Sequence, residues 1–403
     1  MKSRIALLPA IGGLLLLFLL TAFTTPPWGF WGHRRINRLA VFTVPPPLIA
    51  FYKGHIEYIT THAVDPDKRR YATKHEGVRH YMDLDHWGQA PFEAMPRRWS
   101  AALVRWTHYK QITQEGDTIW WQPKGMQQDS SAFTFEAAGQ SWQMDSKAYQ
   151  NFFKAEVLPQ YYEEEWRVEE AAFSTLFDTT FSGSEIIAVD SLSMHGVLPF
   201  NLVRVQRQLT AAFRQKDIAR ILRLSADIGH YIGDAHVPLH TTKNYNGQLT
   251  NQVGIHAFWE SRLPELFADT QYDFFVGKAQ YIDDPSAFYW QIVLDSHALV
   301  DSVLRIDKVL NRTFSESEQY CFEERNGLNV RTQCSAYAAA YHEALDGMVE
   351  RRMRSAIRAI GSAWYTAWVD GGQPVLSEGA EPVSSSLPNF DKKSESVRAR
   401  PHE

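Results

Sequence analysis

Apolar residues recur at helical spacing along much of the chain. One such stripe runs through residues 36–40, and three consecutive prolines at 45–47 interrupt it. Another covers 218–228 and predicts a helix that ends before Pro238, because the residue before a proline disfavours helical backbone angles. The pattern therefore predicts helices in both halves of the chain.

Residues 286–309 and 336–369 have the same spacing and predict two further long helices. Residues 116–146 differ, because GDTIWW, SAFTFEA and QSWQM are aromatic and β-prone, with Gly and Ser between them. We interpret them as a small β-prone insertion, either a lipid-facing or substrate-gating flap or a hairpin packed on the body. The prediction is a mainly α fold, a single multi-helix domain over 28–370, followed by a disordered tail at 371–403 that is rich in Ser, Pro and Glu.

The first residues are typical of a secretory signal peptide. Lys2 and Arg4 give a positive start, residues 5–20 are apolar, and small residues follow before Pro26 and Pro27. We expect 1–27 to be a signal peptide and the protein to be exported, to the periplasm or the extracellular space.

Two cysteines, Cys321 and Cys334, are the only ones in 403 residues. In an exported protein such a pair predicts one structural disulfide, and two cysteines are too few for a Cys-rich zinc site. The net charge of −5 argues against a protein that coats nucleic acid, which needs a basic surface.

The stretch ADIGHYIGDAHVPLH, residues 226–240, carries the candidate chemistry. His230 and Asp234 are four residues apart and so project from the same face of a helix. His240 follows Pro238, where the chain can turn back toward that pair. GIHAFWESRL then places His256 and Glu260 at the same spacing. Imidazole nitrogens and carboxylate oxygens are the usual zinc ligands where thiolates are absent.

Upstream residues extend the same donor set: Asp65 in HAVDPDKRRY, His80 in RHYMDLDH, and His33. A single His-x-x-x-Asp pair is usually an ordinary structural pair, but eight such residues together favour a multinuclear metal site. His86 and His236 lie beside the candidate ligands, and we expect them to support those ligands. The other histidines are expected to have no metal role: His55, His62, His75, His108, His195, His297 and His342.

The ordered pattern of these motifs, from Trp28 to Glu260, resembles the superfamily that joins bacterial zinc-dependent phospholipases C with secreted single-strand-specific zinc nucleases of the S-one/P-one type. The resemblance implies an N-terminal tryptophan, Trp28, whose amino group and carbonyl oxygen bind zinc in the mature chain. Because Pro27 is a poor residue for signal-peptide cleavage, that amine is free only if a second protease trims the chain. Three zinc ions are expected, or two if Trp28 stays covered.

The resemblance also implies a division of ligands among three ions. Asp65, His80, His230 and Asp234 would hold one ion, and Trp28, His33 and the shared Asp234 a second. His240, His256 and Glu260 would hold the third. Asp65 and Asp234 are the carboxylates expected at the catalytic pair of ions, which would generate the hydroxide that attacks phosphorus.

Substrate contacts are implied at three further residues. Lys68 matches a phosphate-contacting basic residue of the nucleases, or else belongs to an ordinary solvated basic run. Tyr81 and Asp83 match positions that hold a base in the nucleases. Glu260, where nucleases have aspartate, and the short connection from His240 to His256 are instead phospholipase features.

We therefore expect an exported zinc-dependent phosphoesterase that hydrolyses phosphodiesters with a metal-bound hydroxide, with a phospholipase C-like activity slightly favoured. A single-strand nuclease or nucleotidase is the alternative within the superfamily. A non-catalytic helical envelope protein stabilised by zinc is the alternative from another class. The expected partner is the substrate, a phospholipid or single-stranded nucleic acid, with no stable nucleic-acid partner. Membrane contact and oligomeric state stay open.

Overall fold

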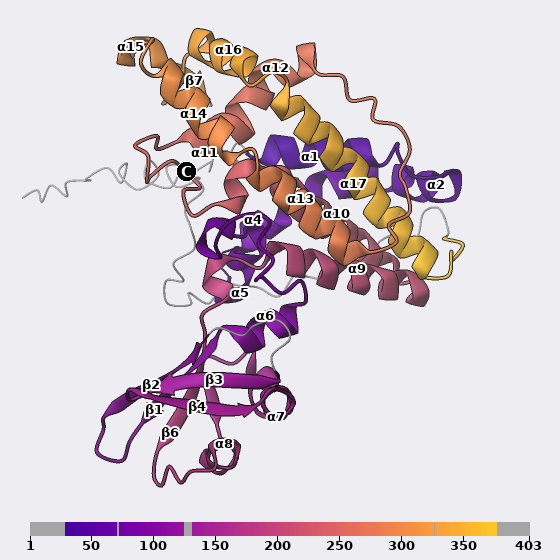
Figure 1. Ribbon diagram of the computed structural model, residues 1–403. Coiled ribbons are helices and arrows are strands. Elements are labelled where there is room, and N and C mark those ends of the chain that lie inside the picture. Colours follow the sequence, from indigo (N-terminus) through magenta and orange to yellow (C-terminus); the bar gives the residue numbers. More distant parts are fainter. Residues whose placement is uncertain (1–28, 71, 125–130, 326, 377–403) are drawn as a thin grey trace, which may run out of the picture.

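A computed structural model describes residues 29–376, apart from 71, 125–130 and 326 (Figure 1). The predicted signal peptide (1–27), Trp28 and most of the predicted tail lie outside these residues. The expected mainly α fold is wrong: the described residues are 57% helix and 13% strand, and they contain a six-stranded antiparallel sheet. The protein is a mixed α and β structure, in which a helical body carries a separate sheet at one end (Figure 1).

The helical body is organised around α10 (Ile218–His236), a 19-residue helix that is buried along most of its length. Five helices pack on it: α1 (Gly29–Ala40), α3 (Ile56–His62), α9 (Leu198–Gln215), α13 (Pro285–His297) and α17 (Met348–Asp370). The other helices of the body are α2 (Pro46–Gly54), α4 (Asp65–Arg69), α5 (Lys74–Gly77), α6 (Trp99–Arg105), α11 (Ile255–Ala257), α12 (Leu263–Gln271), α14 (Val300–Leu310), α15 (Glu316–Gln319) and α16 (Ser335–Ala344). Short 3₁₀ or π turns join them: η1 (Val78–His80), η2 (Leu84–His86), η5 (Ser193–His195), η6 (Pro238–Thr241) and η7 (Phe258–Arg262).

Local sequence explains where α10 begins and ends. The carboxylate of Asp217 accepts a hydrogen bond from the backbone amide of Arg220 and caps the first turn. At the other end α10 stops at His236, two residues before Pro238, as the proline predicts.

The two long C-terminal helices expected from periodicity are each divided. The stretch 286–309 forms α13 and α14, and 336–369 forms α16 and α17. Asp346 and Gly347 separate the second pair with φ values of +49° and +68°, and Gly347, the N-cap of α17, adopts this left-handed conformation without the steric cost of a side chain.

The sheet lies at the end of the molecule away from α17 and has the strand order β4-β3-β2-β1-β6-β5 (Figure 1). Each neighbouring pair is antiparallel, and Tyr109 of β1 stands opposite both Trp121 of β2 and Ala188 of β6. The helices α7 (Ser146–Phe152) and α8 (Glu170–Phe177) accompany it, with the turns η3 (Phe153–Val157) and η4 (Leu158–Gln160). The strands are β1 (Thr107–Ile112), β2 (Thr118–Lys124), β3 (Ala132–Ala137), β4 (Gln140–Asp145), β5 (Trp166–Val168) and β6 (Glu185–Asp190).

The β-prone stretch 116–146 supplies only β2, β3 and β4, and the sheet extends to β6 at residue 190. Aromatic side chains form its core, where the ring of Trp121 lies 4.4 Å from that of Phe177 and 5.4 Å from that of Phe173. Trp120 points the other way and is 44% exposed. The sheet therefore has its own aromatic core, and the flap interpretation applies at most to the face that carries Trp120.

A second, two-stranded sheet is a hairpin of β7 (Tyr320–Arg325) and β8 (Leu328–Gln333) beside α15 and α16. A disulfide joins Cys321 to Cys334, with their Cα atoms 5.0 Å apart. Within the part of the chain that the structure describes, the helices are too short or too polar for any of them to span a membrane.

Candidate metal centre

The centre of the site is one face of α10. His230 and Asp234, one turn apart, are 0% and 1% exposed. Gly229 and Gly233 lie beside them and let α1 approach closely. A β-carbon on Gly233 would come within 2.8 Å of the His33 ring, and one on Gly229 within 2.0 Å of the Asn37 side chain. A glycine directly precedes each of the two candidate ligands on α10, and the space that it leaves allows His33 to lie against Asp234.

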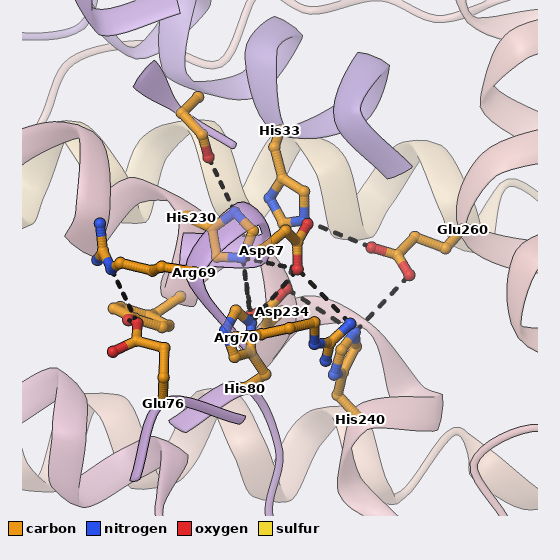
Figure 2. A network of polar contacts seen from close by, with 12 residues as sticks. His33, Asp67, Arg69, Arg70, Glu76, His80, His230, Asp234, His240 and Glu260 are labelled. Carbon is orange, nitrogen blue, oxygen red and sulfur yellow. Dashed lines mark hydrogen bonds and ion pairs between the residues drawn. The ribbon is translucent and has the colours of Figure 1, made fainter. Parts of the chain in front are cut away.

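Six further side chains reach this face from separate elements, and Figure 2 shows most of them around Asp234. Each is largely or partly buried. They are His33 from α1, Asp67 from α4, His80 from η1, His240 from η6, His256 from α11 and Glu260 from η7.

The contacts form a continuous chain of nitrogen and oxygen atoms. His80 Nδ1 is 2.9 Å from one oxygen of Asp234, and His33 Nε2 is 3.3 Å from the other. On the far side Glu260 lies 3.6 Å from His33 Nε2, 3.7 Å from His240 Nε2 and 2.8 Å from His256 Nε2. Two ligands of one tetrahedral zinc ion lie roughly 3.3 Å apart, so most of these separations suit atoms that share an ion.

Four overlapping groups of three residues could each hold a metal ion. In every group the ligand atoms lie within 4.8 Å of one another. The groups are His33, Asp67 and His230; His80, His230 and Asp234; His33, Asp234 and Glu260; and His240, His256 and Glu260.

Two of the histidines are oriented by backbone carbonyl groups. Nδ1 of His230 lies 2.8 Å from the carbonyl oxygen of Ala63, and Nδ1 of His256 lies 3.1 Å from that of Tyr245. A carbonyl can only accept, so each Nδ1 carries the proton. In the neutral ring Nε2 then presents a lone pair to the cluster, the arrangement usual for histidines that bind metals.

Electrostatics couple the groups. Burial alone would lower the pKa of His33, but the carboxylates of Asp234 and Glu260 raise it to about 10. For His80 burial prevails over the attraction of Asp234 and lowers the pKa to about 4. Burial would raise the pKa of Asp234 and of Glu260, yet the surrounding histidines hold both well below their ordinary values. The carboxylates are therefore ionised although the site is largely buried.

Asp67, and not Asp65, is the aspartate of α4 that joins the cluster. One oxygen of Asp67 lies 3.6 Å from His230 Nε2 and 3.7 Å from His80 Nδ1. Asp65 instead contacts His62 Nδ1 at 2.5 Å and Lys68 Nζ at 2.8 Å. The two carboxylates are two residues apart on a helix and so face nearly opposite sides. The geometry therefore favours Asp67 over the expected Asp65 as a candidate ligand, a shift of two positions.

The basic residue beside the cluster is Arg70, two positions after the expected Lys68. Lys68 is half exposed and contacts Asp65, away from the cluster. Arg70, three residues after Asp67, is 4% exposed, and its Nη1 lies 3.8 Å from Asp67 Oδ1. Figure 2 shows its side chain among the cluster residues. The spacing of an aspartate and a cation three residues later occurs twice in DPDKRR, so the sequence alone cannot distinguish Asp65 and Lys68 from Asp67 and Arg70.

Tyr81 and Asp83, expected to hold a base, lie under the segment that returns from the sheet to α9. The Tyr81 hydroxyl donates to the carbonyl of Met194 at 3.1 Å, and the ring is 8% exposed. Asp83 is 1% exposed and lies 3.9 Å from His195 Nδ1. Gly196 lets this segment lie directly against the backbone of Tyr81, since a β-carbon on Gly196 would lie 2.1 Å from the Tyr81 carbonyl oxygen.

The two histidines expected to support the ligands lie outside the cluster. His236 Nδ1 donates to the carbonyl of Ile232 at 2.7 Å, and the His236 carbonyl accepts from Arg352 Nε at 3.0 Å. His86 stacks on His195 with ring centroids 3.4 Å apart. Neither contact touches a candidate ligand. Trp28 lies outside the described residues.

A buried ion network that sequence reasoning missed lies behind His80 and Asp67. Glu76 accepts from Arg69 Nε at 3.1 Å and from the Tyr231 hydroxyl at 2.5 Å, and it also pairs with Arg79. Arg69 continues the network to Asp227 of α10 at 2.8 Å. These contacts fasten α4 and α5 to α10 and so fix the segments that carry Asp67 and His80.

Comparison of the chain with protein-family models, with curated proteins and with solved structures finds no match. The site therefore rests on its own geometry, which shows buried His, Asp and Glu groups that could hold a metal ion.

Proposed function

We propose that this chain is an exported zinc-dependent phosphoesterase that hydrolyses phosphodiester bonds at the candidate metal centre. The observation that carries the proposal is the orientation of His230 and His256. Each directs Nδ1 to a backbone carbonyl and Nε2 to the carboxylates of the cluster. His236 also directs Nδ1 to a backbone carbonyl, so the feature that distinguishes His230 and His256 is that Nε2 of each faces a carboxylate of the cluster.

The donor set fits zinc. Imidazole nitrogens and carboxylate oxygens converge without thiolates, and the pairs lie at separations that suit tetrahedral coordination. His33, His230, Asp234 and Glu260 each belong to two of the four groups, so the groups share ligands and would not all be filled independently. The overlap supports two or three ions. Zinc in such a site supplies a Lewis acid that lowers the pKa of a bound water and neutralises charge on phosphate oxygens.

Residues of the chain would bind the substrate phosphate and hold the metal ions. The guanidinium of Arg70 is buried beside Asp67, where it would bind a phosphate oxygen in bidentate fashion and offset the charge of the phosphodiester. Asp67 and Asp234 would hold the catalytic ions, the roles first expected of Asp65 and Asp234.

Two observations support a phospholipase C-like substrate over a single-stranded nucleic acid. Tyr81 and Asp83 are covered by Met194 and His195, so a nucleobase has no access to the Tyr81 ring. Glu260 occupies the position where the nucleases have aspartate. A phosphodiester with a small head group needs no stacking surface.

The test compares single-stranded DNA with phosphatidylcholine vesicles as substrates for the exported, zinc-replete protein, with Asp234→Asn as the matched inactive control. We expect release of diacylglycerol and no cleavage of the DNA. Cleavage of DNA alone would establish the nuclease alternative. If neither substrate reacts and removal of zinc unfolds the protein, the zinc has a structural role and the phosphoesterase proposal fails.

A further inference from the structure

The turn that carries Glu260 has a second charged side chain on its opposite side. Glu260 and Arg262 both belong to η7, two residues apart. Two residues along a helix differ by about 200°, so Glu260 faces the cluster while Arg262 faces the hairpin of β7 and β8. Arg262 is 4% exposed.

Every nitrogen of the Arg262 guanidinium has an acceptor on that hairpin. Nη1 lies 3.0 Å from one oxygen of Glu323, and Nη2 contacts the other. Nε and Nη2 lie 3.3 and 3.1 Å from the carbonyl oxygen of Gln333. A planar guanidinium held along both edges has one orientation, which a point charge would not impose.

Both acceptors are adjacent to the disulfide. Glu323 lies two residues after Cys321, and Gln333 directly precedes Cys334. Cys334 is also the N-cap of α16, so the disulfide joins the hairpin to the start of that helix. The acceptors of Arg262 are therefore fixed relative to each other by a covalent bond.

The same helix holds the other end of η7. The ring of Phe258 stacks on Tyr341 and Tyr337 of α16, with centroids 4.8 and 5.5 Å apart. The Tyr337 hydroxyl donates to Asp307 at 2.6 Å, and Gln252, which precedes His256, donates to the same carboxylate at 2.6 Å. His256 and Glu260 are thus bracketed by contacts to α14, α16 and the hairpin.

We propose that Arg262 is a positioning residue for the metal centre and that the disulfide-closed hairpin is the support on which it acts. α11, η7 and α12 follow one another without a break over residues 255–271, and the π turn at η7 interrupts the regular α-helical hydrogen bonding at Glu260, so contacts from outside the helix help to fix the orientation of His256 and Glu260. Arg262, held by Glu323 and Gln333, sets the metal affinity of the group His240, His256 and Glu260 without touching an ion. This inference rests on the proposed zinc centre.

The test measures zinc stoichiometry by native mass spectrometry and zinc affinity by competition with a chromophoric chelator. It uses the full exported chain and the variants Arg262→Met and Arg262→Lys. The matched control is Arg331→Met, which removes an exposed arginine of the same hairpin that contacts Glu316 and the Tyr320 ring. Arg262→Met should weaken one ion by about ten-fold or more and leave the others unchanged, as loss of a supporting contact does elsewhere. Arg262→Lys should fall between, and Arg331→Met should match the wild type.

The disulfide is tested by Cys321→Ser/Cys334→Ser, which should weaken the same ion selectively. If Arg262→Met does not fold, Glu323→Gln is measured in its place. This variant removes the charge that pairs with Arg262, keeps the contact of Arg262 with the Gln333 carbonyl, and should destabilise the fold less. Zinc binding by a folded Arg262→Met that equals the wild type contradicts the inference and leaves the phosphoesterase proposal intact. A wild-type protein that binds no zinc contradicts both.

Discussion

The two ends of the metal centre are built in different ways. At one end His230 and Asp234 lie on a single long helix that is packed by five others, and both are almost completely buried. At the other end His256 and Glu260 lie in the first turns of a continuous helix over residues 255–271, where the π turn η7 interrupts the regular α-helical hydrogen bonding, and the Glu260 side chain is 14% exposed. Geometry at the first end is encoded locally by a spacing of four residues. At the second end the same spacing depends on distant segments to hold it.

The largest expected effect is at the α10 end. Asp234→Asn should lower phosphodiester turnover at least about 1,000-fold, because the carboxylate belongs to two of the four ligand groups and faces His33, His80, His230 and His240. Melting temperature and zinc stoichiometry should be measured alongside turnover. Activity near the wild-type level in a folded variant would show that this end does not carry the chemistry.

A matched pair on α4 tests the correction of the ligand set. Asp67→Asn should weaken zinc binding by about 10- to 100-fold, since this carboxylate faces His230 and His80. Asp65→Asn should change the zinc affinity less than about three-fold, since the ion pairs of Asp65 are with His62 and Lys68, which are partly exposed and outside the cluster. Equal effects from the two variants would contradict the assignment of Asp67.

This pair also illustrates what the sequence could and could not predict. His230, Asp234, His256 and Glu260 could be proposed from spacing, because they form two i, i+4 pairs, whereas His33, His80 and His240 are proposed from their donor type and from the resemblance. The aspartate of α4 could not be selected, because Asp65 and Asp67 precede similar cations and only the helix's orientation against α10 distinguishes them.

The β structure was underestimated for a related reason. The stretch 116–146 has clear strand signals, but β6 joins the sheet by pairing with β1, as Asp190 does with Thr107, 83 residues earlier, and β5 has only three residues. The hairpin of β7 and β8 is likewise defined by its register and its disulfide. Tertiary pairing of this kind leaves little trace in local periodicity.

A smaller effect is expected at the outer end of the centre. Glu260→Gln should lower by about ten-fold the zinc affinity of the two groups that contain Glu260, one with His240 and His256 and one with His33 and Asp234, and should leave the group His80, His230 and Asp234 bound. Stepwise removal of zinc with a chelator, followed by native mass spectrometry, would resolve the order of release. Simultaneous loss of all ions in this variant would mean that the two ends form one cooperative site.

The last prediction concerns His33, which joins the two ends by contacting both Asp234 and Glu260. Its pKa is raised to about 10, so in the metal-free protein its proton is held until the pH rises through that value. His80, with a pKa lowered to about 4, is already neutral at pH 8. Zinc needs the neutral imidazole, so binding at pH 8 should release about one proton from His33 and none from His80. Affinity should therefore increase with pH between about 7 and 10.

Proton release is measured by calorimetry of zinc binding in two buffers with different ionisation enthalpies, for the wild type and for His33→Asn. The variant should release about one proton fewer at pH 8, and its affinity should depend less steeply on pH. If wild type and variant release the same number, His33 keeps its proton when zinc binds. The imidazolium would then be an ion-pair partner of Asp234 and Glu260, and the two ends would be joined by charge without a shared ligand.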